Sequence, residues 1–318
     1  MVERPVIQRY LSPDIWEGTK KDLTLKRLVR LINNSGGEYS LQLRENYFNI
    51  YYRGNSLAKV IPDRRGTYTA RIHREFLQLD EPDKILRKLR QYSSISETSQ
   101  NADSKRKYVT FRIQQGRLYH FFHSNHLKAL SSNIREVGYG EEITFEQVLI
   151  TDNPPSDKFI IVDRQVADHK NKAQMDLLAL RRDSANGPFH FVVIEVKLGR
   201  NPELREKVGR QLNAYVDHIG KYMKDYVDCY KENYRQKKDL GVFDPFGPCL
   251  PNEIDIDEDE KTVEGLIVVG GYSGLAEQAL QNLCQQIREK QWDVKVQRMR
   301  NEIKMDNKSY CEELSTAT

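Results

Sequence analysis

Three short apolar segments, followed at once by an amphipathic helix, constrain the fold of this chain most. The segments span residues 159–166, 175–180 and 189–198, with turn-forming residues between them. Their length and their many β-branched and aromatic residues predict three strands. A helix is expected to follow, with Asn201 as its N-cap. Its buried stripe is predicted to comprise Leu204, Val208, Leu212, Tyr215 and Ile219.

Further elements on either side extend this pattern. A helix is expected near residues 142–149, before the three strands. Residues 265–271 read as a buried strand, residues 276–289 as a helix and residues 292–297 as a last strand. The order helix, three strands, helix, strand, helix, strand predicts an α/β (α+β) fold, with a mixed central sheet flanked by helices.

The first hundred residues differ in pattern and predict a small α+β unit. Leu25, Leu28, Val29 and Ile32 form one face of a helix that ends near Gly36. Four alternating or aromatic-rich runs follow, with turn residues between them, and predict an antiparallel meander. The polar stretch 93–105 is expected to be a linker, so domains are predicted at 1–100 and 101–318, with residues 107–135 largely helical.

Composition excludes several classes of protein. The chain has 318 residues with 50 Lys and Arg against 46 Asp and Glu, and this mild basic excess permits a polyanionic partner. No apolar run approaches the roughly 20 residues that cross a bilayer, and the N-terminus does not resemble a targeting signal. The four cysteines form no CxxC pair, so a disulfide framework or a zinc ribbon is not expected. These features predict a cytoplasmic protein that does not enter membranes.

The end of the third strand carries the triplet Glu195-Val196-Lys197. Side chains two positions apart on a strand share a face, so Glu195 and Lys197 would continue the apolar face of Val193. A buried acid and ammonium group are costly unless a ligand or metal compensates them. The alternative is an ordinary strand end that is exposed to water.

Asp176 is the second candidate, because it is the only carboxylate in the apolar segment 175–180. The spacing from Asp176 to Glu195 allows one hairpin, which would bring both carboxylates to one edge of the sheet. With the backbone carbonyl of Val196 between them, they form an oxygen site that suits Mg²⁺ or Mn²⁺. Gln211 and Tyr215 then lie on one face of the following helix, because they are four residues apart.

Taken together, Asp176, the segment VIEVK around Glu195 and Lys197, and QLNAY with Gln211 and Tyr215 resemble the PD-(D/E)xK nuclease superfamily. The resemblance covers about half the chain and is closest to the RecB-like branch, although no proline adjoins Asp176. It implies a restriction-endonuclease-like fold over about residues 142–298.

The resemblance also implies a role for each matching position. Asp176 and Glu195 would bind metal and Lys197 would orient or activate water. Gln211 and Tyr215 would contact the DNA backbone or support the site. Family members carry a further glutamate on a preceding helix. Glu142 and Glu146 both fit that position, and Glu146 is preferred because apolar residues surround it.

The sequence therefore predicts a metal-dependent nuclease acting on DNA, in restriction, phage defence or repair. RNA as a substrate and a homodimer both remain open. The alternatives are a non-catalytic nucleic-acid-binding protein and a subunit of a complex, each of which would retain the nuclease fold. Interleaved basic and aromatic residues in the meander, among them Tyr47, Lys59 and Arg71, suit contacts with nucleic acid, with a solvated sheet face or a protein-docking surface as the alternatives.

Overall fold

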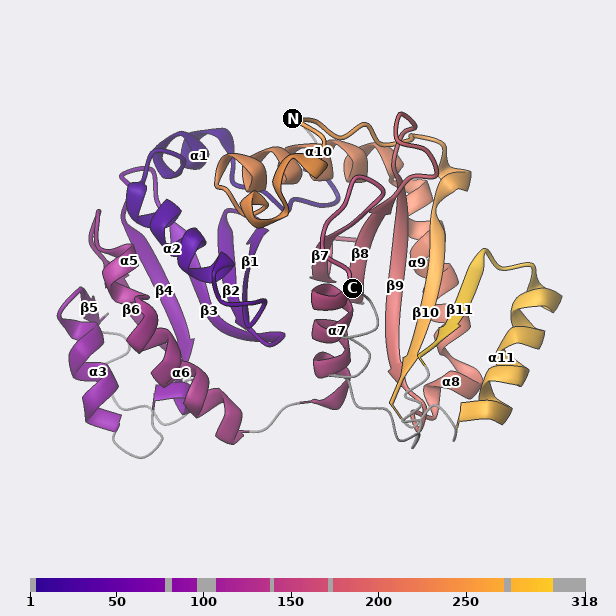
Figure 1. The fold of residues 1–318 in the computed structure, drawn as a ribbon, viewed down its shortest axis with the longest axis horizontal. Helices are drawn as coiled ribbons and strands as arrows, with labels where there is room; N and C mark the ends of the chain where they lie inside the picture. The colour runs from indigo at the N-terminus through magenta and orange to yellow at the C-terminus, as the bar shows by residue number, and fades with distance from the viewer. Residues whose placement is uncertain are drawn as a thin grey trace, which may run out of the picture.

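The computed structural model describes residues 4–77, 82–95, 107–137, 140–170, 174–271 and 276–299. Two sheets lie side by side along the long axis of the molecule, each with its own helices (Figure 1). Each sheet has a separate large apolar core. The sequence prediction of a mixed helix and strand protein is confirmed at this level.

The first sheet is antiparallel throughout and has six strands in the order β1-β2-β3-β4-β6-β5. The strands are β1 (Tyr39–Arg44), β2 (Tyr47–Tyr52), β3 (Asn55–Pro62), β4 (Tyr68–His73), β5 (Ser93–Ile95) and β6 (Tyr108–Ile113). The first four form the predicted meander. Alternate residues such as Phe48, Val60 and Ile72 are fully buried in the core of this half, as a sheet with one covered face requires.

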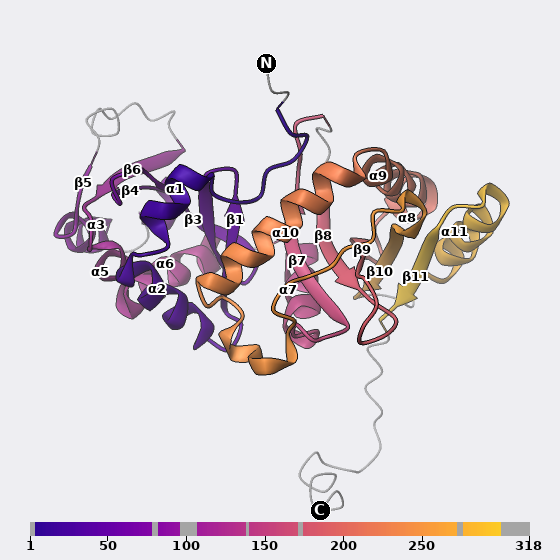
Figure 2. The same ribbon diagram turned by 90° about the horizontal axis from the view of Figure 1, so that it is seen from above.

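Helices cover one face of this sheet. They include α1 (Pro13–Thr19), α2 (Leu23–Asn33), α5 (Leu118–Phe121) and α6 (Ser124–Val137), while η1 (Arg74–Leu77) and α3 (Pro82–Arg90) lie near the sheet's other end. The predicted stripe of α2 is buried at all four positions. In Figure 2 the helices α2 and α6 lie on one side of the strands, so the opposite side is formed by the strands themselves.

The segment after residue 106 differs from its prediction. Residues 107–135 were expected to be largely helical, but β6 pairs with β4 and β5. The reason is the alternation in this segment, which buries Phe111 and Ile113 in the first core. Helices α5 and α6 bury Leu118 and Leu130 in that same core, so the first sheet and its helices extend to Val137, past the predicted boundary at residue 100.

The second sheet is mixed and has five strands in the order β11-β10-β9-β8-β7. These are β7 (Phe159–Val166), β8 (Met175–Arg181), β9 (His190–Leu198), β10 (Glu264–Gly270) and β11 (Val294–Arg298). The first three are antiparallel neighbours, and β9, β10 and β11 run parallel. All three predicted central strands and the mixed sheet are confirmed.

Helices lie on both faces of the second sheet. They are α7 (Glu141–Asp152), α8 (Glu203–Glu206), α9 (Val208–Lys221), α10 (Met223–Asp239) and α11 (Glu277–Lys290), with two short turns η2 (Asp244–Cys249) and η3 (Glu260–Thr262). Strand β9 alternates between the two faces. Val193 packs in the core that includes Leu212 of α9, and Ile194 packs in the cluster that Phe145 of α7 joins.

The helix after β9 is divided. Its stripe is buried as predicted. Pro202 takes the N-cap position of α8, and the predicted cap Asn201 lies one residue earlier, where its side chain accepts a 2.9 Å hydrogen bond from the amide of Glu203. A break at Lys207 separates α8 from α9, where one helix had been expected. The following helix, α10, was not predicted from the sequence. It buries Tyr226, Tyr230 and other aromatic groups although most of its residues are polar.

Turns of the first sheet pack against α7 of the second half. A Cβ atom on Gly54, which has φ +87°, would stand 2.4 Å from a methyl group of Ile143. Gly37 approaches Thr151 in the same way, and the side-chain amide of Gln147 donates to the carbonyl of Gly37 at 3.1 Å. The helix α7 therefore contacts both halves of the molecule.

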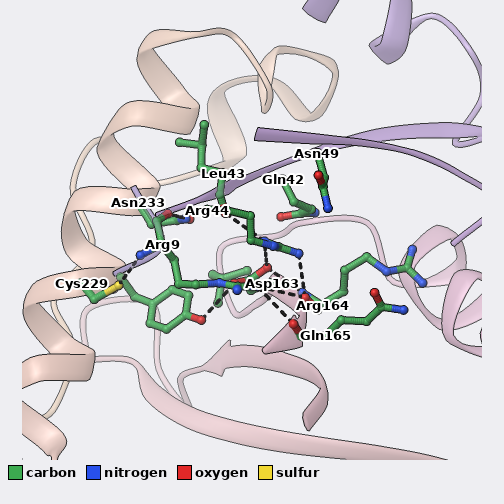
Figure 3. A network of polar contacts seen from close by, with 12 residues as sticks. Arg9, Gln42, Leu43, Arg44, Asn49, Asp163, Arg164, Gln165, Cys229 and Asn233 are labelled. Atoms are coloured by element: carbon green, nitrogen blue, oxygen red, sulfur yellow. Dashed lines mark hydrogen bonds and ion pairs between the residues drawn. The ribbon is translucent and has the colours of Figure 1, made fainter. Parts of the chain in front are cut away.

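A buried carboxylate joins segments that lie far apart in the sequence (Figure 3). One carboxylate oxygen of Asp163 on β7 accepts from the guanidinium group of Arg9 at 2.6 Å. The other accepts from the guanidinium group of Arg44 on β1 at 2.5 Å. The hydroxyl group of Tyr230 on α10 donates to it at 3.1 Å. Burial alone would raise the pKa of Asp163, but Arg44 and Arg9 hold it well below its ordinary value. The two guanidinium groups thus keep the buried carboxylate ionised.

The helix α10 contributes a second buried cation to this junction. Lys237 donates to the side chain of Gln42 at 2.7 Å and to the carbonyl of Val162. Burial lowers the pKa of Lys237 to about 7, although Asp163 opposes the shift. One helix therefore links the first strand of the first sheet to the edge strand of the second.

Replacement of Asp163 tests this junction. We expect Asp163→Asn to reduce the free energy of unfolding by about 3–5 kcal/mol, because two buried guanidinium groups lose their counter-charge. Urea unfolding monitored by circular dichroism measures the loss. Asp228→Asn breaks the exposed pair with Lys224 and serves as the control, with an expected change within about 0.5 kcal/mol. Equal effects of the two substitutions would contradict this role of Asp163.

Candidate functional site

The predicted site residues come together where β8, β9 and α9 meet. Strands β8 and β9 are antiparallel neighbours, with Leu177 opposite Ile194. One oxygen of Asp176 accepts a hydrogen bond of 2.8 Å from the backbone amide of Val196. The carboxylate of Asp176 is therefore held against the segment that carries Glu195 and Lys197, as the predicted hairpin requires.

Glu195 is the most enclosed carboxylate of this group, with an exposed fraction of 1%. Its Oε1 atom accepts from the ammonium group of Lys197 at 2.8 Å and from the side-chain amide of Gln211 at 3.2 Å. Its Oε2 atom is buried and has no hydrogen-bond partner among the described residues. Buried acceptors are normally satisfied, so this atom has the capacity to receive a further ligand.

Gln211 and Tyr215 support Glu195 from the helix α9. The amide of Gln211 donates to the hydroxyl oxygen of Tyr215 at 3.0 Å as well as to Glu195. The hydroxyl group of Tyr215 in turn donates to the backbone carbonyl of Gln174 at 3.2 Å. Gln211 and Tyr215 therefore link the carboxylate on β9 to the chain just before β8.

The carboxylates of the site interact with one another. Burial raises the pKa of Glu195 to about 7, and the nearby charge of Asp176 adds to the shift while Lys197 opposes it. Burial also raises the pKa of Asp176, against the effect of its hydrogen bond from Val196. Burial would lower the pKa of Lys197, but Glu195 raises it above its ordinary value. The site thus holds a fixed ammonium group beside two carboxylates that repel each other.

The two candidate glutamates of α7 occupy different environments. Glu142 lies beside the end of β9, where it accepts from Asn201 at 2.6 Å and from the amide of Leu198 at 3.4 Å. Its charge contributes to the raised pKa of both Asp176 and Glu195. Glu142 therefore interacts with the site carboxylates, and it is the α7 glutamate that is hydrogen-bonded to the segment that carries Lys197.

Glu146, which the sequence favoured, pairs instead with the buried guanidinium group of Arg164 at 2.9 Å. Burial raises the pKa of Glu146 to about 7, against the charge of Arg164, while Asp176 contributes to the rise. Glu146 is therefore close enough to Asp176 for the two charges to interact, and the ion pair with Arg164 of β7 fixes the position of Glu146.

Arg164 is a residue that sequence reasoning missed. Its guanidinium group also donates to the side chain of Gln147 on α7 at 2.9 Å. Its positive charge opposes the rise in the pKa of Asp176 that burial causes. The available signal was the pair Asp163-Arg164 inside an otherwise apolar strand, which is the same kind of signal that identified Asp176. An ionised residue in the middle of a buried strand requires a partner.

The site holds few groups that could ligate a metal ion. No set of three His, Cys, Asp or Glu side chains in the described ranges is arranged to hold a metal ion. The ligands expected from the sequence are fewer, namely the carboxylates of Asp176 and Glu195 and the carbonyl of Val196. Hard oxygen donors of this kind suit Mg²⁺, and the unpartnered Oε2 atom of Glu195 fits a cation.

No protein-family model matches this chain, and no curated protein or solved structure is significantly similar to it. Within the described ranges, no helix has both the length and the apolar character needed to span a bilayer.

The raised pKa of Glu146 predicts a pH effect on stability. Because its pKa is about 7 in the folded protein and ordinarily near 4.5, the folded state binds more protons between these values. The contribution of Glu146 to stability is therefore fully present below pH 4.5 and falls as the pH rises toward 7. Between pH 5 and pH 8, we expect the free energy of unfolding of Glu146→Gln to rise by about 2–3 kcal/mol relative to that of the wild type, at about 1.4 kcal/mol per pKa unit.

Urea unfolding at several pH values, with EDTA present, measures this difference. Glu141→Gln, on the exposed side of the same helix, is the matched control and should follow the wild type. A constant difference between Glu146→Gln and the wild type over this range would contradict the buried, raised carboxyl group.

Proposed function

We propose that this chain is a metal-dependent nuclease that hydrolyses DNA phosphodiester bonds. The observation that carries the proposal is the convergence of Asp176, Glu195, Lys197 and Gln211 at one place, with Oε2 of Glu195 buried and unpartnered. A binding surface alone would not need an ammonium group fixed beside one buried and one half-buried carboxylate, because burial of such groups is costly.

Asp176 and Glu195 would hold the metal ion, with the carbonyl of Val196 as a further ligand. A bound Mg²⁺ ion would supply positive charge to the phosphate oxygens and favour ionisation of the attacking water. The hydrogen bond from Val196 to Asp176 orients one carboxylate, and Gln211 orients the other. Both ligands are therefore held in place by groups of this chain.

Lys197 would act on the attacking water and on the charge that develops at phosphorus. Lys197 is 6% exposed, and its ammonium group is held at 2.8 Å from Glu195, with Glu203 at 3.7 Å. A raised pKa keeps it protonated at neutral pH, so it supplies a preorganised positive charge. The residues from α9 would steady Glu195 from behind through Gln211 and Tyr215.

The arrangement of the second half also supports the proposal. Its order is α7, the antiparallel strands β7, β8 and β9, the helices α8, α9 and α10, and then the parallel strand β10. Apart from the division of the first helix after β9 and the added helix α10, this is the order of elements inferred from the sequence. The PD-(D/E)xK resemblance places its carboxylates on the strands that correspond to β8 and β9. The restriction-endonuclease-like assignment of this half is part of the same proposal.

Substitutions within the site test the proposed activity. We expect Asp176→Ala and Lys197→Ala each to lower Mg²⁺-dependent cleavage of plasmid DNA at least about 100-fold, because each removes charge from the reacting centre. Binding of DNA, measured by gel shift in EDTA, should persist. The control is Asp183→Ala, an exposed residue in the turn between β8 and β9, which should cleave as the wild type does.

Cleavage by both Asp176→Ala and Lys197→Ala at the rate of the wild type would remove the assignment. Wild-type protein that shifts DNA but never cleaves it with Mg²⁺ or Mn²⁺ would favour the non-catalytic binding protein instead.

A further inference from the structure

A polar pocket of about 230 Å³ opens on the first sheet, away from the proposed metal site. It is lined by Asn49, Ser56, Lys59, Arg71, His73 and Tyr108. Their neighbours Phe48, Val60, Ala70 and Ile72 point into the apolar core. Since side chains alternate along a strand, the pocket lies on the sheet face opposite the helices α2 and α6. This face is built from residues of β2, β3, β4 and β6.

Two cations stand side by side in this pocket. Lys59 and Arg71 are directly opposite each other on β3 and β4. Within the described part of the chain, no carboxylate forms an ion pair with either of them. Glu45, whose charge reaches Lys59, binds Arg4 and lies 3.5 Å from His169. Burial and the charge of Arg71 lower the pKa of Lys59. Like charges held together without a counter-ion favour an anionic ligand.

Aromatic rings accompany both cations. The ammonium group of Lys59 lies 3.7 Å from the ring centre of Tyr47, and the guanidinium group of Arg71 lies 5.2 Å from that of Tyr108. Tyr108 is 46% exposed, and His73 packs against its ring at 88°. A ring that contacts Arg71 and His73 and is nearly half exposed to solvent can stack with a planar ligand.

Buried polar atoms of the pocket also lack partners. Oδ1 of Asn49 is buried and has no hydrogen-bond partner among the described residues. Nδ1 of His73 is also buried and makes no hydrogen bond there, with the carboxylate of Glu75 3.6 Å away. Such atoms are uncommon in folded proteins and mark places where a ligand supplies the missing bond. They offer an acceptor and a ring nitrogen beside the two cations.

We propose that this pocket binds a nucleic-acid strand, with a backbone phosphate on Lys59 and Arg71 and a base stacked on Tyr108. A phosphate matches the two cations, and a base matches the open ring and the unpartnered atoms of Asn49 and His73. An acidic peptide would match only the cations. Paired cationic and aromatic groups are typical of single-strand binding surfaces.

The inference rests on the proposed function. It assigns to the first sheet the binding of the nucleic-acid strand that the site in the second sheet would cut. In Figure 1, α2 and α6 lie in front of the first sheet and α9 lies behind the second. The pocket face of the first sheet and the α9 face of the second therefore turn toward the same side of the molecule.

Binding of a fluorescein-labelled oligo(dT) strand, measured by anisotropy in EDTA, tests the inference without cleavage. We expect Lys59→Met with Arg71→Met to weaken binding at least tenfold at 0.1 M salt. The slope of log K against log salt concentration should fall by about 0.7, because the two cations contact one phosphate. The control is Arg27→Met with Arg30→Met, an equal change of charge on exposed positions of α2, which should bind as the wild type does.

Tyr108→Ala should weaken binding about 5- to 100-fold and leave the salt slope unchanged, because stacking carries no charge. Thermal melting checks that each variant is folded. If the double variant unfolds, Lys59→Gln and Arg71→Gln alone should each weaken binding at 0.1 M salt and lower the slope by up to about 0.7.

Wild-type protein that binds no oligonucleotide, or variants of Lys59, Arg71 and Tyr108 that bind as the wild type does, would overturn the inference. Equal competition by poly-glutamate with no effect of Tyr108→Ala would also overturn it, in favour of an acidic peptide. Failure of the two proposals is distinguishable. If oligonucleotide binding needs Lys59, Arg71 and Tyr108 but the wild type never cleaves DNA, only the nuclease proposal is contradicted. If the wild type cleaves DNA and the variants bind it unaltered, only the pocket proposal is contradicted.

Discussion

The ion pairs of Asp163 hold together segments that are remote in the sequence. A carboxylate with 1% exposure can remain ionised only if nearby groups replace the water that it has lost, and here Arg9, Arg44 and Tyr230 do so. These groups belong to the N-terminal segment, the first sheet and the helix α10. Loss of any one removes part of what compensates this buried charge, so the contact favours a single arrangement of the two halves.

The next residue carries this junction toward the candidate site. The backbone carbonyl of Arg164 accepts from both Arg9 and Arg44, while its side chain binds Glu146 and Gln147 on α7. The helix α7 also presents Glu142 to the end of β9. The placement of the first sheet, of α7 and of the carboxylates on β8 and β9 is therefore coupled through one buried strand.

Local patterns in the sequence were sufficient for part of this account. The strands β7, β8 and β9, the stripe of α9 and the grouping of Asp176 with Glu195 follow from apolar periodicity and from one isolated carboxylate. What could not be predicted depends on contacts between distant segments. The strand β6 follows a long polar stretch and is fixed by pairing with β4, and α10 is buried through its tyrosines although its composition is polar. The partners of Asp163 and Arg164 lie in three other segments, and the preference for Glu146 over Glu142 did not anticipate Arg164.

The central claim is that Asp176 and Glu195 share one metal ion beside Lys197. The most direct measurement is the anomalous difference density of a crystal soaked with Mn²⁺. The account predicts one peak bounded by Asp176 and by Oε2 of Glu195, at distances near the roughly 2.1 Å typical of Mg²⁺ sites. A crystal in which Mn²⁺ binds elsewhere, or in which Oε2 of Glu195 stays without a ligand at saturating Mn²⁺, would contradict it.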